Sequence, residues 1–373
     1  MSFDSFIQQD APLVHAADVA VTEVVRVKPG ERVLIITNPE PDVSAISMAL
    51  YDAVRRAGGR PVVVYQDRKT QLDFAEDSVI GALEAGPDAV FSISAEKMGK
   101  DEKGIRDPYG ERIKYDHIFH HHLYGEKTVR GFWSPTVTRD MFVRTVPIDY
   151  ARLARESALV KRVLDRAVSV RVVNGNGTDL TIGLAGREAK VDDGDFSRPG
   201  TGGNLPAGET FISPVVGTSE GTIAFDGSIS SHEGVIVISE PIRVKVEAGF
   251  VTEVKGGAEA ETLARSLQLA AENARRFERE GKLAAGKGEL YAKNAYNIGE
   301  LGIGLNPQAR ITGNMLEDEK AAKTCHIAIG HNYDDDAPAL IHLDGLITGP
   351  TITAVMEDGS RVTVLENGEL ALG

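Results

Sequence analysis

The chain has 373 residues, a length that fits two domains, each with its own hydrophobic core. Its 41 Lys and Arg residues against 55 Asp and Glu residues give a formal net charge of −14, which argues against partners such as nucleic acid or an anionic membrane. With a single cysteine, Cys325, the chain can form neither an intrachain disulfide nor a cysteine-rich zinc site.

The N-terminal part of the chain alternates strands and helices. Residues 1–6 lack the basic and apolar regions of a signal peptide, and no apolar run reaches the roughly 18 residues of a membrane span, so we expect a cytoplasmic protein. The pattern that follows predicts a parallel sheet covered by helices, with strands over 32–37, 61–65 and 88–93 and a helix over 41–56. The turn at 38–42 is rich in proline and acidic residues. It lacks G-x-G-x-x-G, which excludes a dinucleotide-binding turn.

Strands dominate after a predicted helix near 149–166. The turn Asn174–Gly177 between two β-rich runs predicts a hairpin over 168–182. Further predicted elements are strands over 221–225, 234–239, 242–246 and 250–254, a long helix over 258–281, and a hairpin of 351–355 with 361–365. We therefore expect an α/β domain over residues 1–150 and a β-rich α+β metal-binding domain over residues 151–373.

His342 and Asp344 are the most informative residues of the second half. They lie two apart in the strand-like run 339–346, so their side chains point to the same face. An imidazole beside a carboxylate can chelate a metal ion or form a proton-transfer pair. The alternative is a half-buried polar pair, bonded to each other or to the backbone.

Another strand-like run, 324–330, carries His326. Alternation places the small residues Ala328 and Gly330 on the face of His326, which leaves room beside the imidazole. The alternative is a core histidine satisfied by a carbonyl group. Cys325 points to the opposite face, so the sequence offers little support for a cysteine nucleophile.

Two glutamates are further candidates. Glu300 lies among glycines and aliphatic residues, and a buried carboxylate needs a partner or a metal; a solvent-facing glutamate on an edge strand is the alternative. Glu209 follows a loop rich in glycine and proline, and its spacing alone does not distinguish it from an ordinary loop carboxylate.

Two further clusters are weaker candidates. We interpret His117, His120, His121 and His122 as a partly exposed local run, for which substrate contact is more plausible than metal ligation. Residues 334–336 are three aspartates without the spacing of a calcium loop, and we expect a solvated acidic loop there.

Taken together, several segments resemble the thermophilic metallopeptidases typified by aminopeptidases T and S. The likeness rests on residues 204–209, 299–304, 324–330, 332–333 and 341–344, with weaker matches at 134–139 and 177–180. It covers residues 130–373 well and the N-terminal domain loosely. The resemblance implies a two-domain α/β fold, a homodimer and a pair of divalent metal ions.

The resemblance also implies roles for individual residues. The positions that match the metal ligands of that family are Glu209, Glu300, His326, His342 and Asp344. Tyr333 matches an active-site tyrosine, and Glu300 is the first candidate for the proton shuttle. Zinc, cobalt, manganese and magnesium are all compatible with such ligands.

A second branch of the superfamily resembles this chain in its compact form. The segment between His326 and His342 is shorter than in the aminopeptidases, as it is in the 2,5-dihydroxypyridine dioxygenases, which use one Fe(II). Those enzymes keep the His-x-Asp pair, but they have histidine in place of Glu300 and lack equivalents of Glu209 and His326. The residues of this chain therefore favour a hydrolase with two metal ions.

The function that the resemblance implies is hydrolysis of an amide bond, with a small peptide or small amide as substrate and release of an N-terminal amino acid. The short segment before His342 leaves a non-peptide amide open as the substrate. The alternatives are the Fe(II) ring-opening dioxygenase and a non-catalytic metal-binding or interaction protein on the same scaffold.

Overall fold

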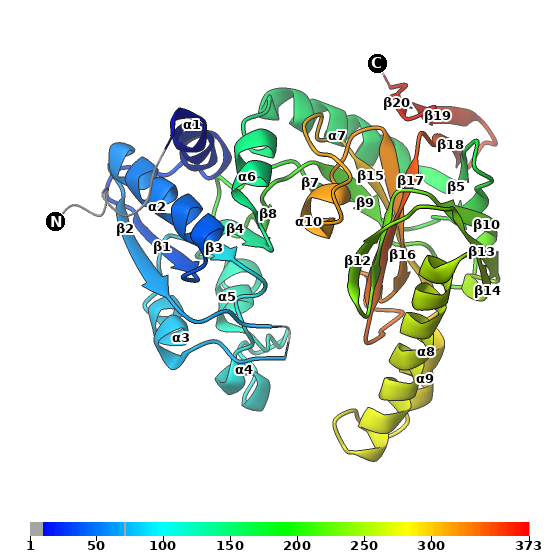
Figure 1. Ribbon diagram of the computed structural model, residues 1–373, viewed down its shortest axis with the longest axis horizontal. Coiled ribbons are helices and arrows are strands. Elements are labelled where there is room, and N and C mark those ends of the chain that lie inside the picture. The colour runs from blue at the N-terminus through cyan, green and yellow to red at the C-terminus, as the bar shows by residue number, and fades with distance from the viewer. Residues whose placement is uncertain (1–9, 71, 373) are drawn as a thin grey trace. The chain divides into compact units, whose positions relative to one another are not determined.

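The computed structural model describes residues 10–70 and 72–372, and the chain forms two compact units (Figure 1). The first unit comprises Met1–Ala154 and Asp192–Ala207, and the second comprises Arg155–Val191 and Gly208–Gly373. The sequence pattern predicts one boundary near residue 150, which would place 192–207 in the second domain, whereas this segment belongs to the first unit. The 1–6 stretch, considered above for a signal peptide, lies outside the described residues.

A five-stranded parallel sheet forms the centre of the first unit. Its order is β2 (Arg60–Tyr65), β1 (Arg32–Thr37), β3 (Ala89–Ser94), β4 (Arg130–Pro135) and β8 (Gly202–Asn204). Every residue of β3 is buried, as expected for a strand covered by helices on both faces. The predicted parallel α/β region is therefore confirmed.

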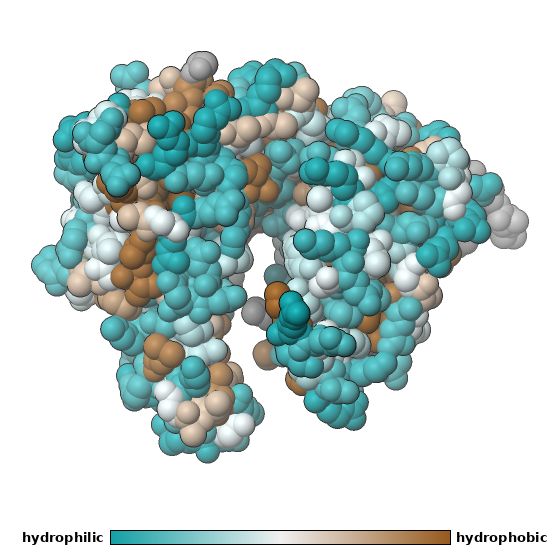
Figure 2. Space-filling model, turned by 180° about the vertical axis from the view of Figure 1, so that it is seen from behind, coloured by the Kyte–Doolittle hydropathy of each residue, from teal (hydrophilic) through white to brown (hydrophobic). Residues whose placement is uncertain are grey.

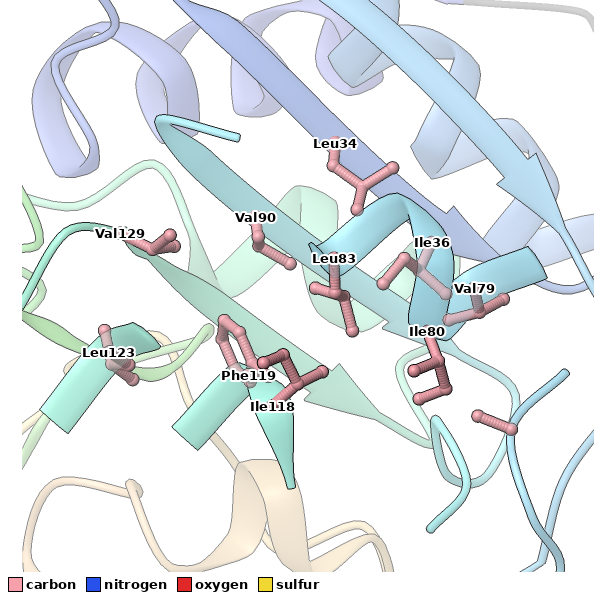
Figure 3. Close-up of a cluster of buried hydrophobic side chains, with 11 residues drawn as sticks. Leu34, Ile36, Val79, Ile80, Leu83, Val90, Ile118, Phe119, Leu123 and Val129 are labelled. Carbon is pink, nitrogen blue, oxygen red and sulfur yellow. The ribbon is translucent and has the colours of Figure 1, made fainter. Parts of the chain in front are cut away.

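Helices pack on this sheet and close its core. They are α1 (Ala11–Val19), α2 (Pro41–Arg56), α3 (Asp77–Glu84), α4 (Glu102–Arg106), α5 (Ile118–His120) and α6 (Arg139–Thr145), with π-helical turns η2 (Ala20–Val24) and η3 (His121–Gly125). The next helix, α7 (Tyr150–Leu164), carries the chain from the first unit into the second, which begins at Arg155. Figure 3 shows one core cluster, in which Leu83 of α3 and Phe119 of α5 pack toward Val90 of β3. The helix predicted over 41–56 begins at Pro41, whose missing N–H costs nothing at the first helical position.

The second unit contains two sheets. An eight-stranded sheet has the order β14 (Phe250–Lys255), β13 (Ile242–Glu247), β10 (Glu220–Phe225), β6 (Asp179–Gly183), β5 (Ala167–Val173), β18 (Thr351–Met356), β19 (Arg361–Glu366) and β20 (Glu369–Leu370). A seven-stranded sheet has the order β12 (Gly234–Val237), β11 (Ser228–Ser231), β17 (His342–Thr348), β16 (Thr324–Gly330), β15 (Ile298–Gly304), β9 (Glu209–Ile212) and β7 (Lys190–Asp192). The predicted β-rich C-terminal region and its two hairpins are confirmed.

Three helices accompany these sheets: α8 (Ala258–Arg279), α9 (Gly288–Asn294) and α10 (Met315–Asp318). The long helix predicted over 258–281 is present as α8. In Figure 1, α8 and α9 lie side by side and extend beyond the sheets. Leu340 and Ile341 pack against a cluster that includes Ala270, Ala271 and Ala274 of α8. The helices α8 and α9 therefore support the segment that leads into β17.

The face shown in Figure 2 is mainly hydrophilic. This face carries hydrophobic residues only in patches among hydrophilic ones. Among the described residues, none of the helices combines the length and the apolar character needed to cross a bilayer.

Candidate functional site

The five residues predicted as metal ligands converge on one face of the seven-stranded sheet. Strand register explains how, because cross-strand partners share a face. Asp344 of β17 is opposite Ala328 of β16, and Glu300 of β15 is opposite the same alanine. Two residues away on the same face, His326 of β16 pairs with Gly302 of β15, and Gly304 of β15 pairs with Glu209 of β9. The sheet therefore assembles residues that are up to 135 positions apart in the chain (209 to 344).

Small residues make room for these side chains. Gly302 is the cross-strand partner of His326, and a Cβ atom at Gly302 would lie 2.0 Å from the imidazole. Gly304, opposite Glu209, has the backbone of Ala321 at a similarly short distance from a Cβ position. A β-bulge between Ile298 and Glu300 interrupts the β15–β16 register, and such bulges commonly redirect a side chain.

Glu300 lies at the centre of the cluster and contacts both histidines. Its Oε1 is 2.9 Å from Nε2 of His326, and its Oε2 is 3.4 Å from Nε2 of His342. Nε2 of His342 is also 3.1 Å from Oδ1 of Asp344. On the other side, Nε2 of His326 is 3.6 Å from Oε2 of Glu209. Glu300 is 3% exposed, which rules out the solvent-facing glutamate that the sequence had left open.

The ring of His342 is oriented by the backbone. Its Nδ1 donates a hydrogen bond to the carbonyl oxygen of His331 at 2.8 Å, which leaves Nε2 to face Asp344 and Glu300. A neutral His342 would then present a lone pair to two carboxylates. Three acceptors that face one another are stable only with a shared proton or a cation between them.

Several buried atoms of the cluster have no hydrogen-bond partner among the described residues. They are Oε2 of Glu209, Oε2 of Glu300, Oδ1 of Asp344 and Nδ1 of His326. The same side chains form two groups with metal-ligand geometry, Glu209–Glu300–His326 and Glu300–His342–Asp344, whose ligand atoms lie within 4.8 Å of one another in each group. Buried polar atoms normally have partners, so this donor set fits divalent cations.

The histidines and carboxylates of the cluster shift one another's pKa values. Burial alone would raise the pKa of Glu300, but the contacts of its two oxygens with His326 and His342 hold it below its ordinary value. Against burial, the charge of His342 lowers the pKa of Asp344 to about 2. Burial likewise opposes protonation of His326, yet the bond to Glu300 raises its pKa to about 9. Without a metal ion, Glu300 and Asp344 are thus charged and the histidines hold the compensating protons.

Lys320 is part of the site although the sequence did not indicate it. Its side chain is fully buried, and Nζ lies 2.6 Å from Oε1 of Glu209 and 2.6 Å from Oε1 of Glu319. Burial and the neighbouring carboxylates of Glu209 and Asp344 raise the pKa of Glu319 to about 7, although Lys320 opposes this. A charged run such as 317–320 is typical of an exposed helix end, so no sequence signal pointed to a buried lysine.

Tyr333 lies in the segment between β16 and β17, beside the cluster. Its ring centroid is 5.1 Å from that of His342 and 5.3 Å from that of Phe211. Burial and the nearby carboxylates, Glu300 first, raise the pKa of the Tyr333 hydroxyl, so the hydroxyl remains protonated and can donate a hydrogen bond.

Two basic residues hold the segment that carries Tyr333. Nζ of Lys190 donates to the backbone oxygen of Tyr333 at 2.6 Å. Arg187 pairs with Asp336 at 2.6 Å and with Asp334 at 3.4 Å. Residues 334–336 are exposed, and two of these three aspartates are paired with one arginine.

The histidines of the run 117–122 belong to the first unit, whereas the five candidate metal ligands belong to the second. His117 is buried, His121 and His122 are half-buried, and His120 is exposed. Nδ1 of His122 is 2.7 Å from Oε2 of Glu126, and none of the metal-ligand groups found among the described residues includes these histidines. Their contact with substrate stays a prediction.

Cys325 is fully buried on the opposite face of β16, in line with the predicted alternation. Burial raises the pKa of its thiol well above the ordinary value. A thiol in this state is a poor nucleophile and a packing group.

Comparison at the sequence level relates the chain to a family of dioxygenases. A family model described as 2,5-dihydroxypyridine 5,6-dioxygenase matches residues 138–328, just over half of the chain. The 2,5-dihydroxypyridine 5,6-dioxygenase of Pseudomonas putida is 26% identical over 164 residues. This match spans 44% of the chain and 41% of the relative, so the chain aligns with less than half of that protein.

Two solved structures share the fold over nearly the whole chain. The 2,5-dihydroxypyridine dioxygenase of Pseudomonas putida KT2440 superposes with a TM-score of 0.70 at 19% identity, covering 98% of this chain and 99% of that one. Wild-type AmpT from Thermus thermophilus superposes with a TM-score of 0.64 at 18% identity, covering 96% and 99%. At these identities the likeness establishes the fold, and the chemistry has to be argued from the residues of the site.

Proposed function

Because the chain belongs to the family described as 2,5-dihydroxypyridine 5,6-dioxygenase, we propose that it is a metal-dependent enzyme, and we infer from its own residues that it hydrolyses an amide bond. The observation that carries this proposal is the pair of ligand groups that share Glu300. A carboxylate with one oxygen toward each group is suited to bridge two ions.

The composition of the site supports two divalent ions. Three carboxylates and two imidazoles supply hard and borderline ligands that suit zinc, cobalt, manganese or magnesium. A single Fe(II) in an oxygenase is typically held by two histidines and one carboxylate. The group Glu300–His342–Asp344 instead has one histidine and two carboxylates, which favours hydrolysis.

The residues of the chain have distinct roles in this proposal. Divalent ions bound here would lower the pKa of a water molecule and polarise the substrate carbonyl. Glu300 is ionised, and an oxygen of its carboxylate that is not bound to an ion could accept the proton of the attacking water and return it to the leaving amine. Tyr333, whose hydroxyl remains protonated, donates a hydrogen bond to the oxygen on which charge develops.

The proposed substrate is a small peptide or another small amide. The aminopeptidases that the chain resembles release N-terminal amino acids, and AmpT shares its fold. The segment between β16 and β17 is only 11 residues long, 331–341, and it carries Tyr333 beside the cluster. A short segment at this place makes a compact non-peptide amide equally suitable as substrate. We also propose a homodimer, which light scattering of the purified protein would test.

A second candidate is the ring-opening dioxygenase. The family model and the 26% identical relative favour it, because both carry that description. In this reading a single Fe(II) would be held at Glu300–His342–Asp344, and Glu209 and His326 would have another role.

One experiment distinguishes the two candidates. The purified protein is analysed for bound metal, then assayed with a panel of aminoacyl amides and dipeptides, and with 2,5-dihydroxypyridine under air in the presence of Fe(II). Hydrolysis with two ions per chain supports the proposal, whereas oxygen uptake with one iron would replace it. Metal binding without any turnover would point to the non-catalytic reading.

Variants locate the activity. Glu300→Ala and His342→Ala should abolish turnover while the protein remains folded. Glu233→Ala and His232→Ala change the same residue types at exposed positions of the second unit and should retain activity. Full activity in either of the first two variants would contradict the assignment of the site.

A further inference from the structure

The buried lysine beside the candidate metal site calls for a functional explanation. Lys320 is 0% exposed and lies between two carboxylates, with Nζ 2.6 Å from Oε1 of Glu209 and 2.6 Å from Oε1 of Glu319. A buried ammonium group is costly unless it is paired, and ion pairs of this kind stabilise little more than a well-packed apolar side chain would. Stability alone is therefore a weak reason for a lysine at this position.

The two oxygens of Glu209 face different cations. Oε1 accepts a hydrogen bond from Lys320, whereas Oε2 has no hydrogen-bond partner and lies 3.6 Å from Nε2 of His326. A divalent ion in the group Glu209–Glu300–His326 would therefore share Glu209 with the ammonium of Lys320. The charge of Lys320 also lowers the pKa of Asp344 in the second group, Glu300–His342–Asp344, but it does so less than the charges of His342 and His326 do.

We propose that Lys320 acts as a built-in cation at the Glu209 side of the site, so that the two ligand groups bind divalent ions with unequal affinity. The group Glu300–His342–Asp344 binds the first ion tightly. The group Glu209–Glu300–His326 binds the second ion weakly, because Lys320 already compensates part of the charge of Glu209. This inference rests on the metal-dependent function proposed above and refines it. The enzyme at rest holds one ion at the tight group, and the second ion exchanges with solution.

Charge balance gives the direction of the effect. The ammonium repels an incoming divalent ion and draws electron density toward Oε1, which weakens Oε2 as a ligand. Without this ammonium, Glu209 and Glu319 would be two neighbouring carboxylates with no counter-ion between them. Uptake of a divalent ion would then relieve their repulsion, so loss of Lys320 should strengthen the second binding step.

The test is a titration of the metal-free, full-length protein with Mn²⁺, in which electron paramagnetic resonance measures the free ion. In the unmodified protein we expect two steps whose dissociation constants differ by about tenfold or more. In Lys320→Met, which removes the charge and keeps a chain of similar length, the weaker dissociation constant should fall by about tenfold or more. The midpoint of thermal unfolding should also rise more with Mn²⁺ in this variant than in the unmodified protein.

Two controls accompany this variant. Lys323→Met makes the same change at an exposed lysine paired with Glu369, and it should bind Mn²⁺ as the unmodified protein does. Lys320→Arg retains the positive charge and should keep the second step weak. A purely structural role would instead lower the affinity of both Lys320 variants.

A second pair of variants tests the assignment without any change at Lys320. Glu209→Gln should keep the tight step and lose the weak one, whereas Asp344→Asn should lose the tight step. These measurements decide which group binds the tight ion even if Lys320→Met fails to fold, and Lys320→Arg then remains as the variant of the lysine itself.

The possible failures are distinguishable. Loss of the tight step in Glu209→Gln would overturn the inference, and so would a second step in Lys320→Met that is unchanged or weaker. In both cases the metal-dependent function would remain. If the unmodified protein binds no Mn²⁺ at either step, the metal-dependent function itself is wrong.

Discussion

Gly302→Ala is the smallest change that should disable half of the site. The Cβ of an alanine at this position would lie 2.0 Å from Cε1 and Nε2 of His326 and 2.8 Å from Cδ2. His326 is 1% exposed and lies between strands on both sides, so the imidazole has to leave its place. Its contact of 2.9 Å with Oε1 of Glu300 would be lost.

The magnitude follows from two terms. Overpacking of a buried position by one methyl group costs about 1–3 kcal/mol, and loss of a hydrogen bond between charged groups costs about 1.5–3 kcal/mol. The metal-free variant should therefore be less stable by roughly 2–5 kcal/mol, since the two terms overlap. Intrinsic strand propensity works in the opposite direction, because alanine is a better strand residue than glycine.

Urea unfolding of the metal-free proteins measures this effect. Gly81→Ala is the matched control: a Cβ at Gly81 in α3 meets nothing within 4 Å, and the substitution should stabilise by about 0.5–1 kcal/mol. In a His326→Ala background the steric conflict is absent, so Gly302→Ala should cost much less there. An equal cost in both backgrounds, or an unchanged urea midpoint and Mn²⁺ isotherm, would refute the reasoning.

Three further predictions concern pH, metal removal and the Tyr333 segment. The pKa of His326 is raised from 6.5 to about 9, so protonated His326 stabilises the metal-free fold fully below pH 6.5. This contribution of roughly 1–3 kcal/mol to the free energy of unfolding should be lost as the pH rises to about 9. A free energy of unfolding that stays constant or increases between pH 6.5 and 9 would contradict the prediction. Removing bound metal with a chelator should lower the unfolding free energy by about 2.7 kcal/mol for an ion present at 100 times its dissociation constant, measured by denaturant titration, and identical curves would show that no ion binds the native state. Arg187→Ala removes the ion pairs with Asp334 and Asp336 that hold the segment carrying Tyr333. As a result, kcat/KM should fall roughly tenfold or more, with little change in the unfolding midpoint. Arg171→Ala breaks an exposed pair with Asp179 and should change neither kcat/KM nor the unfolding midpoint.

Elements with a strong local pattern could be predicted from the sequence. The apolar runs of β1 and β3 and the hairpin of β5 and β6 are visible as patterns of a few residues. His342 and Asp344 were found for the same reason, since a period of two places them on one face of β17. The room for the His326 ring comes from Gly302 on the neighbouring strand, whereas the sequence pattern pointed to Ala328 and Gly330 on the histidine's own strand.

Features that depend on distant partners could not be predicted from local pattern. Glu209 belongs to the site because β9 pairs with β15, and nothing in its own segment sets that register. Lys320 is buried where Glu209, more than a hundred residues earlier in the chain, and Glu319 pair with its ammonium group. β8, with the sequence Gly202-Gly203-Asn204, has almost no strand propensity and exists because β4 offers an edge to pair with.

The discontinuity of the two units limits how this protein can be divided. The chain passes from one unit to the other three times, after Ala154, after Val191 and after Ala207. A truncation after Ala154 would deprive the first sheet of β8, and a fragment that begins at Arg155 would carry a segment that belongs to the other unit. No single recombination point yields two complete halves. Glu209 lies two residues after Ala207, where the chain returns to the second unit. A transplant of the ligand face onto another protein would therefore have to include two separate segments of the chain, 155–191 and 208–373.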